Sequence, residues 1–228
     1  MTISIVVPVF NEAEWAPKTL RYLADTFSEC ELIAVDGGST DETVALIKPY
    51  VRVMVSQRGR AYQMNAGAMA TSGEILWFIH ADSQVQREAL PLMYAALKNP
   101  AIVGGGFRLR FAEHLLSLRA IAYASNLRAK YLQWIFGDQS LFVRRSYWDA
   151  VGQFPAQPIM EDLELSRRLK QYGKLVLLPS PSQSSGRRLI RNGIWRTIVG
   201  MQVAKLRYFL GVAPDRIVKT YPGAGGPA

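Results

Sequence analysis

The first 80 residues alternate short apolar runs with segments of helical spacing, and this alternation restricts the fold more than any other feature. The runs are rich in β-branched residues and occupy residues 3–9, 31–35, 51–55 and 75–79. Strands that alternate with helices across short connections predict a parallel, right-handed, doubly wound sheet. With 228 residues and 49% apolar content, the chain is long enough to form a single α/β domain around one core.

The second half of the chain predicts a different part of the sheet. Residues 102–111 alternate apolar and polar side chains, which is typical of the antiparallel part of a mixed sheet. A further strand is expected at 174–178. We therefore expect a mixed, mostly parallel sheet flanked by helices. The turn after the first strand reads Phe10-Asn11-Glu12 and lacks the G-x-G-x-x-G of dinucleotide-binding folds, so NAD and flavin binding are set aside.

The charge of the chain implies an anionic partner. Lysine and arginine outnumber aspartate and glutamate by 27 to 18, which gives a net charge of +9. The excess is concentrated after residue 186 and would suit phosphate groups, an anionic membrane surface or nucleic acid. No nucleic-acid-reading motif accompanies the charge, so nucleic acid is not expected. Cys30 is the single cysteine, and no secretory leader precedes the first strand, so we expect a reducing, cytoplasmic location.

Polar residues follow the apolar run at 75–79 at a spacing of two. They are His80, Asp82 and Gln84, and they share one side if the chain stays extended there. Ligands bind beyond the carboxyl ends of strands in open parallel sheets, so these residues suggest a partial site for Mn²⁺ or Mg²⁺. The alternative is structural: Ser83 and Gln86 fit a capping box for a helix at 87–98.

Two further patterns have a structural and a functional interpretation. Glu161 and Asp162 lie in the first turn of a predicted helix, where acids are common as dipole partners and where a general base could also be placed. In the helix predicted at 61–70, Asn65 and Gly67 have poor helix propensity. Their presence indicates close packing, either against a ligand or against the sheet.

Four landmarks, in this order and context, resemble family 2 nucleotide-sugar glycosyltransferases with the GT-A fold. They are Pro-Val-Phe-Asn-Glu at 8–12, Val-Asp-Gly-Gly-Ser-Thr-Asp at 35–41, His-Ala-Asp at 80–82 and Glu-Asp-Leu-Glu-Leu at 161–165. The resemblance covers nearly the whole chain, to about Tyr221. Residues 59–67 and 137–139 are similar to a small bacterial subgroup that is often labelled by analogy with carotenoid or arsenosugar glycosyltransferases.

The resemblance implies a division of the chain. A GT-A domain would span residues 1–221, with a nucleotide-binding half at about 1–100 and an acceptor-side half at about 101–186. A basic helical segment would follow at about 187–215, and residues 222–228 would form a disordered tail.

The resemblance also assigns roles to residues. Asp36 would hold the nucleobase, with uracil favoured; Asp82 would be the second acid of the metal motif, and Asp162 the catalytic base beside Glu161. Two positions depart from the family pattern, because His80 replaces the first acid of the metal motif and Gly37 replaces the second acid of Asp-Asp-Gly-Ser. The full set of implied nucleotide contacts is Pro8, Phe10, Asn11, Glu12, Asp36, Gly37, Ser39, Arg58, Arg60, Asn65, His80 and Ala81.

These roles imply an inverting, metal-assisted transfer of a sugar from a nucleotide-diphosphate donor, with a UDP-sugar favoured, to an acceptor hydroxyl. Negative charge develops on the leaving diphosphate, which a metal ion and arginines can stabilise. Arg187 and Arg188 are the preferred phosphate clamp, and the alternative is a solvated basic loop. Further candidates are Arg58, Arg60 and Arg191 for phosphate, and Gly137, Asp138 and Gln139 for the acceptor side. The rival interpretation is a nucleotide-sugar-binding protein that is catalytically impaired, with His80 as the defect.

Two apolar segments late in the chain also require interpretation. Residues 114–136 form a long amphipathic stretch, and we expect its apolar side to face the core. Residues 194–212 combine apolar residues with Arg196, Lys205 and Arg207. This segment either packs on the core or lies on an anionic membrane on the inner face, where it would suit a lipid-like acceptor.

Overall fold

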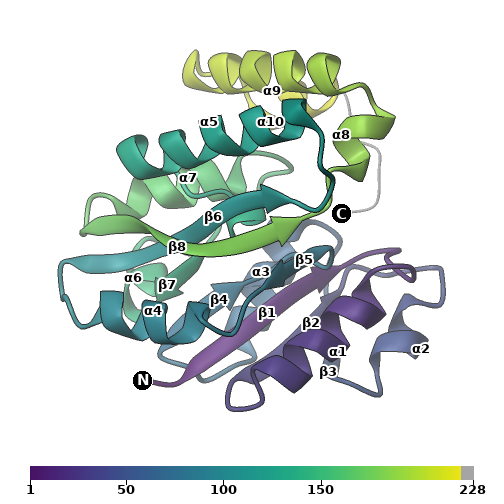
Figure 1. The fold of residues 1–228 in the computed structure, drawn as a ribbon, viewed down its shortest axis with the longest axis vertical. Helices are drawn as coiled ribbons and strands as arrows, with labels where there is room; N and C mark the ends of the chain where they lie inside the picture. The colour runs from purple at the N-terminus through teal and green to yellow at the C-terminus, as the bar shows by residue number, and fades with distance from the viewer. Residues whose placement is uncertain (222–228) are drawn as a thin grey trace.

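The computed structural model describes residues 1–221, so the tail predicted at 222–228 lies outside the described residues. One eight-stranded sheet runs through the molecule in the order β3-β2-β1-β4-β7-β6-β8-β5 (Figure 1). The strands are β1 (Ile3–Val9), β2 (Glu31–Asp36), β3 (Arg52–Val55), β4 (Ile75–Phe78), β5 (Ser83–Val85), β6 (Ile102–Phe111), β7 (Phe142–Arg144) and β8 (Lys174–Ser184).

Helices surround this sheet on both faces (Figure 1). They are α1 (Ala16–Thr26), α2 (Thr43–Ile47), α3 (Arg60–Met69), α4 (Ala89–Leu97), α5 (Leu116–Leu132), the short 3₁₀ helix η1 (Gly137–Gln139), α6 (Arg145–Ala150), α7 (Glu161–Leu169), α8 (Arg187–Arg191), α9 (Ile194–Phe209) and α10 (Pro214–Val218). The predicted mixed α/β fold is therefore confirmed.

The parallel half of the sheet is formed by β3, β2, β1 and β4, as the alternation of the first 80 residues predicts. Every residue of β1 and β4 is buried, which is why these strands read as unbroken apolar runs. The register pairs Val9 with Asp36 and Val6 with Phe78. This pairing brings the polar turns that follow β1, β2 and β4 to the same edge of the sheet.

The second half of the sheet is mixed. β7 pairs antiparallel with both β4 and β6, whereas β6 and β8 run parallel over a long register. β5 is a short edge strand that pairs antiparallel with β8. The long β8 strand therefore ends beside the turn that follows β4 and leads directly into α8.

The core lies on both faces of the sheet. On one face α1 and α4 pack around Trp77, whose ring meets Phe27 at 5.1 Å between centroids. On the other face α3, α5, α6 and α7 pack around Phe78 and Phe154, whose rings meet edge-on at 4.9 Å. Gly67 lets α3 approach this face, because a Cβ there would lie 2.4 Å from Val6 Cγ1. Packing on the sheet explains the glycine without a ligand.

The stretch at 114–136 meets only in part the expectation that its apolar side faces the core, because Ile135 and Phe136 after the end of α5 are buried but much of α5 is not. Within α5 the buried side chains are Leu118, Ala122 and Ala129. The larger apolar side chains of α5 point outward, including Leu116 and Tyr131. Among residues 1–221, no helix has both the length and the apolar character required to span a membrane.

Candidate functional site

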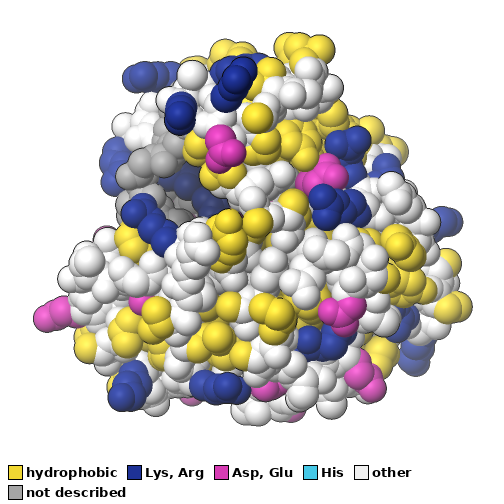
Figure 2. Space-filling model, turned by 180° about the vertical axis from the view of Figure 1, so that it is seen from behind, with side chains coloured by type: hydrophobic (Ala, Val, Ile, Leu, Met, Phe, Trp, Pro, Cys, Tyr) yellow, Lys and Arg dark blue, Asp and Glu magenta, His cyan; other side chains and the backbone are white. Residues whose placement is uncertain are grey.

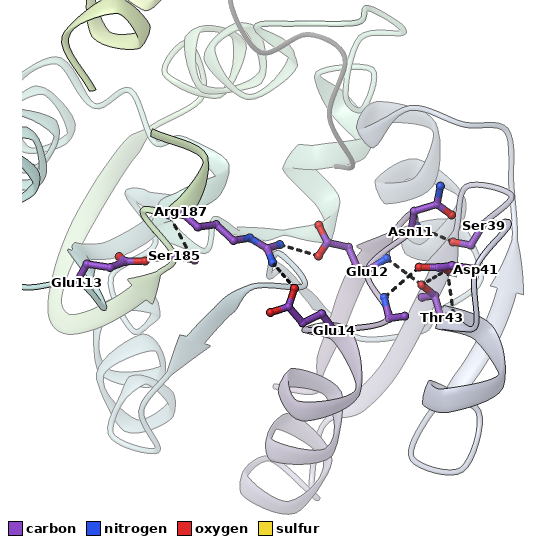
Figure 3. A network of polar contacts seen from close by, with 10 residues as sticks. Asn11, Glu12, Glu14, Ser39, Asp41, Thr43, Glu113, Ser185 and Arg187 are labelled. Carbon is purple, nitrogen blue, oxygen red and sulfur yellow. Dashed lines mark hydrogen bonds and ion pairs between the residues drawn. The ribbon is translucent and has the colours of Figure 1, made fainter. Parts of the chain in front are cut away.

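The loop after β1 is joined to the loop after β2 by hydrogen bonds between backbone and side chains (Figure 3). Asn11 adopts a left-handed conformation with φ 51°, and its backbone N–H donates to Ser39 Oγ at 2.9 Å. The Asn11 side-chain oxygen accepts from the N–H of Thr40 at 2.8 Å, and the Glu12 N–H donates to Thr43 Oγ1 at 2.8 Å. These bonds fix the two loops as one wall at the edge of the sheet.

Asp36 holds the turn after β2. Its carboxylate accepts the N–H groups of Gly38 and Ser39 at 2.9 Å each, and also the Ser39 hydroxyl. A carboxylate has about four acceptor positions, so one remains for a further donor. Gly37 lies against the side-chain amide of Gln63. The nitrogen of that amide donates to the carbonyl oxygens of Val9 and Val35, at 2.8 Å each.

Three more of the predicted nucleotide contacts, Pro8, Phe10 and Arg58, lie at this wall. The guanidinium of Arg58 stacks over the ring of Phe10, with 4.0 Å from Cζ to the ring centroid. Pro8 lies within β1 opposite Val35 and is buried. The half-exposed Phe10 ring and the exposed Arg58 therefore form the outer surface of the wall, and Pro8 supports it from inside.

Asn65 lies elsewhere. Its side-chain nitrogen donates to the carbonyl oxygen of Phe154 at 2.9 Å, and its side-chain oxygen accepts the Phe154 N–H at 3.1 Å. This two-point bond fastens α3 to the loop after α6 and explains a polar residue within the helix. We therefore reassign Asn65 from nucleotide contact to packing.

The turn after β4 corrects part of the predicted metal site. The chain does not stay extended after His80, because the Ser83 N–H donates back to the His80 carbonyl oxygen at 3.0 Å. Ala81 and Asp82 form the turn, and Gln84 is exposed on the edge strand β5. Gln84 thus does not join His80 and Asp82. The capping alternative is also wrong, since Ser83 lies in β5 and α4 begins at Ala89 without a side-chain cap.

The carboxyl group of Asp82 lies in a strongly cationic environment. Burial raises its pKa, whereas the charges of Arg187, Arg188 and Arg60 lower it. Burial together with Arg60 and Arg188 lowers the pKa of His80 to about 3, so its imidazole is neutral at physiological pH. The turn after β4 therefore places one carboxyl group and one neutral imidazole among three arginines.

Arg187 connects the C-terminal part of the chain to the loop after β1 (Figure 3). Its guanidinium donates to the buried Glu12 at 2.8 Å and lies 3.8 Å from Glu14. It also lies 4.6 Å from the centroid of the Trp15 ring. Glu113 accepts the Gly186 N–H at 2.8 Å just before Arg187, which fixes the start of α8.

The other predicted phosphate ligands occupy different environments. Arg188 is half-buried, and burial followed by the neighbouring charge of Arg60 lowers its pKa. Arg60 lies 3.8 Å from Glu161. Arg191 is exposed at the end of α8, away from these contacts. The structure thus brings Arg60, Arg187 and Arg188 together and leaves Arg191 outside.

The two acids at the start of α7 are held differently. Asp162 Oδ2 accepts the N–H of Gly137 at 2.9 Å, and its Oδ1 accepts the N–H of Leu163. Glu161 is buried, and its pKa is raised from 4.5 to about 7 by burial and then by the neighbouring charge of Asp162. Asp162 is thus the oriented acceptor, and Glu161 is a group that titrates near neutrality.

The short helix η1 links this acidic pair to the turn after β4. A Cβ on Gly137 would lie 2.3 Å from His80 Nε2, so the glycine lets the imidazole pack against the backbone. Burial raises the pKa of Asp138, and its Oδ1 is buried with no hydrogen-bond partner among the described residues. Gln139 accepts from Arg128 at 2.8 Å and is buried.

The side chains that could act as metal ligands decide whether a divalent cation would fit. Within residues 1–221 there is no cluster of three or more His, Cys, Asp or Glu side chains suited to a metal. Mg²⁺ and Mn²⁺ are nevertheless often held by one or two carboxylates together with substrate phosphates and water. Asp82 supplies one such carboxylate beside the arginines, so the residues fit a cation that shares its coordination with a bound diphosphate.

The comparison with protein families decides the classification of this arrangement. The model of the family described as glycosyl transferase family 2 matches residues 4–152, which include the loops after β1, β2 and β4. The chain belongs to glycosyl transferase family 2. The family assignment that the landmarks suggested is therefore confirmed, as is the GT-A fold.

Relatives and solved structures resemble this family 2 chain at low identity. Glycosyltransferase AglE of Haloferax volcanii is 25% identical over 169 residues, which cover 67% of this chain and 56% of the relative. A mannosyltransferase of Pyrobaculum calidifontis, solved with GDP-Man and Mn²⁺, superposes with a TM-score of 0.68 at 18% identity, over 89% of this chain and 61% of the other.

A glucosyl-3-phosphoglycerate synthase of Mycobacterium tuberculosis, solved with Mg²⁺ and UDP, gives a TM-score of 0.63 at 18% identity, with 89% and 78% of the two chains covered. The chain therefore spans little more than half the length of AglE, and the solved structures share its fold.

Several residues of the site have no signal in the sequence. Trp15 lies outside the landmarks, Gln63 lies in the 59–67 segment but was given no role, and Glu113 becomes relevant only because it holds Gly186. Tyr221 lies close enough to Arg188, Arg60 and Asp162 for their charges to act on its phenol, although burial is the main cause of its raised pKa. The Glu that ends the first landmark and an Arg after the last strand are a pattern that could have suggested the Glu12–Arg187 pair.

Proposed function

We propose that the protein is an inverting glycosyltransferase that moves a sugar from a nucleotide-diphosphate donor to an acceptor hydroxyl. The observation that carries the proposal is the convergence of Asp82, Arg60, Arg187 and Arg188 at one sheet edge, with Asp162 fixed beside them by Gly137. Membership of family 2 supports this assignment. Two structurally similar proteins were solved with GDP-Man and with UDP, so nucleotide-diphosphate sugars are the first donors to test.

The nucleoside would lie against the wall formed by the loops after β1 and β2. Asp36 has one acceptor position left for a base or ribose donor, and Phe10 offers an aromatic surface beside it. We propose uracil as the base, whose N–H could donate to Asp36; guanine also has N–H donors, so this contact does not choose between the two bases. Guanine is the competing base, and a direct comparison of UDP-sugars with GDP-sugars distinguishes the two.

The diphosphate would lie between Asp82 and the arginines. A Mn²⁺ or Mg²⁺ ion held by Asp82, with neutral His80 beside it, would neutralise the leaving diphosphate as a Lewis acid. Arg188 and Arg60 supply fixed positive charge at the same place. Arg187 is bound to Glu12 and becomes available to phosphate only when that ion pair opens or is shared.

The acceptor hydroxyl would approach from the side of η1 and α7. The Asp162 carboxylate is oriented by two backbone N–H groups, so it can accept the hydroxyl proton as the oxygen attacks the anomeric carbon. One displacement from the face opposite the diphosphate inverts the anomeric configuration. Gly137, Asp138 and Gln139 would form the acceptor wall, and a lipid-like alcohol at the inner face of a membrane is the acceptor class that we propose.

Turnover and binding together test this function. Release of nucleoside diphosphate from UDP- and GDP-sugars, with Mn²⁺ or Mg²⁺ present, is expected for one donor base. Asp162→Asn should lower the rate by about 10²–10⁴-fold without loss of donor binding, whereas Asp149→Asn on the exposed end of α6 should leave it unchanged. Donor binding without turnover would favour the impaired sugar-nucleotide-binding protein, and a retained anomeric configuration would contradict the single displacement.

A further inference from the structure

Helix α9 carries a stripe of apolar residues on the side that faces away from the protein. Trp195 is 72% exposed, Leu206 60% and Leu210 73%, and Val199 and Val203 lie between them on the same face. The spacing of these positions is that of one helix stripe. The buried side of α9 is formed by Thr197 and Ala204. Ile194, Ile198, Met201 and Tyr208 are half-buried, so α9 has apolar residues on both sides and turns one apolar stripe outward.

Helix α5 repeats this arrangement. Leu116, Tyr123 and Tyr131 are 78%, 67% and 68% exposed, and Leu127 lies in the same stripe. The two helices meet at their C-terminal ends, where Trp134 stacks on Phe209 with 5.3 Å between ring centroids. Figure 1 shows α5 and α9 together at one end of the molecule. The exposed apolar stripes of α5 and α9 are together called the α5–α9 surface below.

The α5–α9 surface is flanked by positive charge. Arg119 and Lys130 flank the α5 stripe, and Arg196 and Arg207 flank the α9 stripe. Residues 114–137 and 165–214 contain no aspartate or glutamate. Figure 2 shows Lys and Arg side chains beside hydrophobic ones at the end of the molecule that carries α9. The surface therefore combines apolar area with cations that no acid on the same helices neutralises.

A hollow adjoins the α5 stripe and adds to this charge. It has a volume of about 440 Å³ and shares Arg119 and Tyr123 with the α5 region. Arg110 and His114 also line it, and its acid, Glu113, is already engaged by Gly186. An anionic headgroup could thus be met by cations at the border of the apolar stripe.

We propose that the α5–α9 surface docks on the surface of an anionic lipid bilayer. Apolar side chains would enter the boundary between headgroups and acyl chains, and the flanking cations would contact the headgroups. A second copy of the chain fits less well, because pairing this face with itself would bring the same uncompensated cations together. The inference is independent of catalysis, since lipid binding needs neither donor nor metal.

Docking at this surface would bring the bilayer close to the candidate site. Ala204 of α9 packs in one cluster with Leu163, which follows Asp162 on α7, and with Phe136, which precedes Gly137. A single helix layer thus separates the surface from the acids and from η1. A lipid-like acceptor could reach the site from the membrane without complete extraction into water.

Vesicle flotation at low salt tests the proposal with the 228-residue chain. Wild-type protein should float with vesicles that contain phosphatidylglycerol and remain unbound with pure phosphatidylcholine. Val199→Glu with Leu206→Glu should lower the bound-to-free ratio at least about tenfold, because both side chains are exposed and the fold does not depend on them. Arg119→Gln, Lys130→Gln and Arg196→Gln should each weaken binding by up to about fivefold.

A matched pair of exposed positions away from the surface controls for added charge. Leu46→Glu with Met69→Glu, on α2 and α3, introduces the same charge and should float like wild type. The melting temperatures of all variants establish that they are folded. Wild-type protein that fails to float with anionic vesicles would overturn the proposal. So would unchanged flotation of the α9 variant, or a wild-type dimer in sedimentation velocity that the α9 variant abolishes.

Discussion

Replacement of Glu161 by glutamine should stabilise the protein in a strongly pH-dependent way. Burial, followed by the charge of Asp162, raises the pKa of Glu161 from 4.5 to about 7, even with Arg60 3.8 Å away. An acid with a raised folded pKa stabilises the folded state only while it is protonated, so its contribution is fully present below about pH 4.5 and is lost as the pH rises through about 7.

The size of the effect follows from that pKa. Each pKa unit corresponds to about 1.4 kcal/mol, so an ionised Glu161 costs the folded state about 3 kcal/mol at about pH 8.5. At about pH 5 the cost is about 1 kcal/mol. Glu161→Gln mimics the protonated group, so its gain should be larger at the higher pH by about 2 kcal/mol. For a chain of this length that difference corresponds to about 4–8 °C in melting temperature.

The assay is a series of melting curves at several pH values for wild type, Glu161→Gln and a control. Glu88→Gln is the control, because Glu88 is an exposed residue at the start of α4 with no side-chain cap bond. The control should follow the wild-type pH profile. A Glu161→Gln profile that runs parallel to wild type from about pH 5 to 8.5 would refute the assignment of Glu161 as a buried group that titrates near neutrality.

Three further substitutions test contacts that the structure defines. Gly137→Ala should lower the free energy of unfolding by about 1–3 kcal/mol, because its Cβ would lie 2.3 Å from His80 Nε2; equal denaturant midpoints for variant and wild type would contradict this contact. Gly67→Ala should also destabilise by about 1–3 kcal/mol in spite of the better helix propensity of alanine, since its Cβ would meet a β1 side chain at 2.4 Å. Arg187→Ala should cost about 1–3 kcal/mol and weaken donor binding, because it leaves the buried Glu12 without its guanidinium. That cost should be greater above neutral pH, since burial already raises the pKa of Glu12, and adding Glu12→Gln should recover most of the stability.

The arrangement of the parallel half of the sheet could be predicted from the sequence because each strand and turn is recognisable from a few consecutive residues. The strands β1 to β4 are β-branched or apolar runs whose lengths and connections leave few alternatives. The turns at their carboxyl ends follow from the same register, which brings Asp36 and His80 to one edge of the sheet. The fold and the family were thus confirmed together.

The errors arose where tertiary contacts decide the outcome. The spacing of His80, Asp82 and Gln84 would place them together only in an extended chain, and the hydrogen bond from Ser83 to His80 turns the chain instead. Asn65 is explained by Phe154, a residue 89 positions away that no local pattern connects to it. These contacts depend on the assembled fold, so periodicity and propensity contain no information about them.

The outward stripes of α5 and α9 illustrate a different limit. Periodicity identifies an apolar side of a helix, but it does not say whether that side meets the protein core or another apolar medium. For α5 the prediction of a core-facing stripe was met only by Leu118, Ala122 and Ala129. The packed structure was needed to show which side of each helix meets the protein.

Thermal melting with nucleoside diphosphates tests the central proposal most directly. UDP and GDP are added to wild type and to Asp82→Ala, each with Mn²⁺ or with EDTA. A ligand at about 100 times its Kd stabilises the native state by about 2.7 kcal/mol, or about 5–10 °C for a chain of this length. The account predicts such a shift for one base, dependent on Mn²⁺ in wild type and reduced in Asp82→Ala. No shift with either nucleotide in the presence of Mn²⁺ would contradict the proposed donor site.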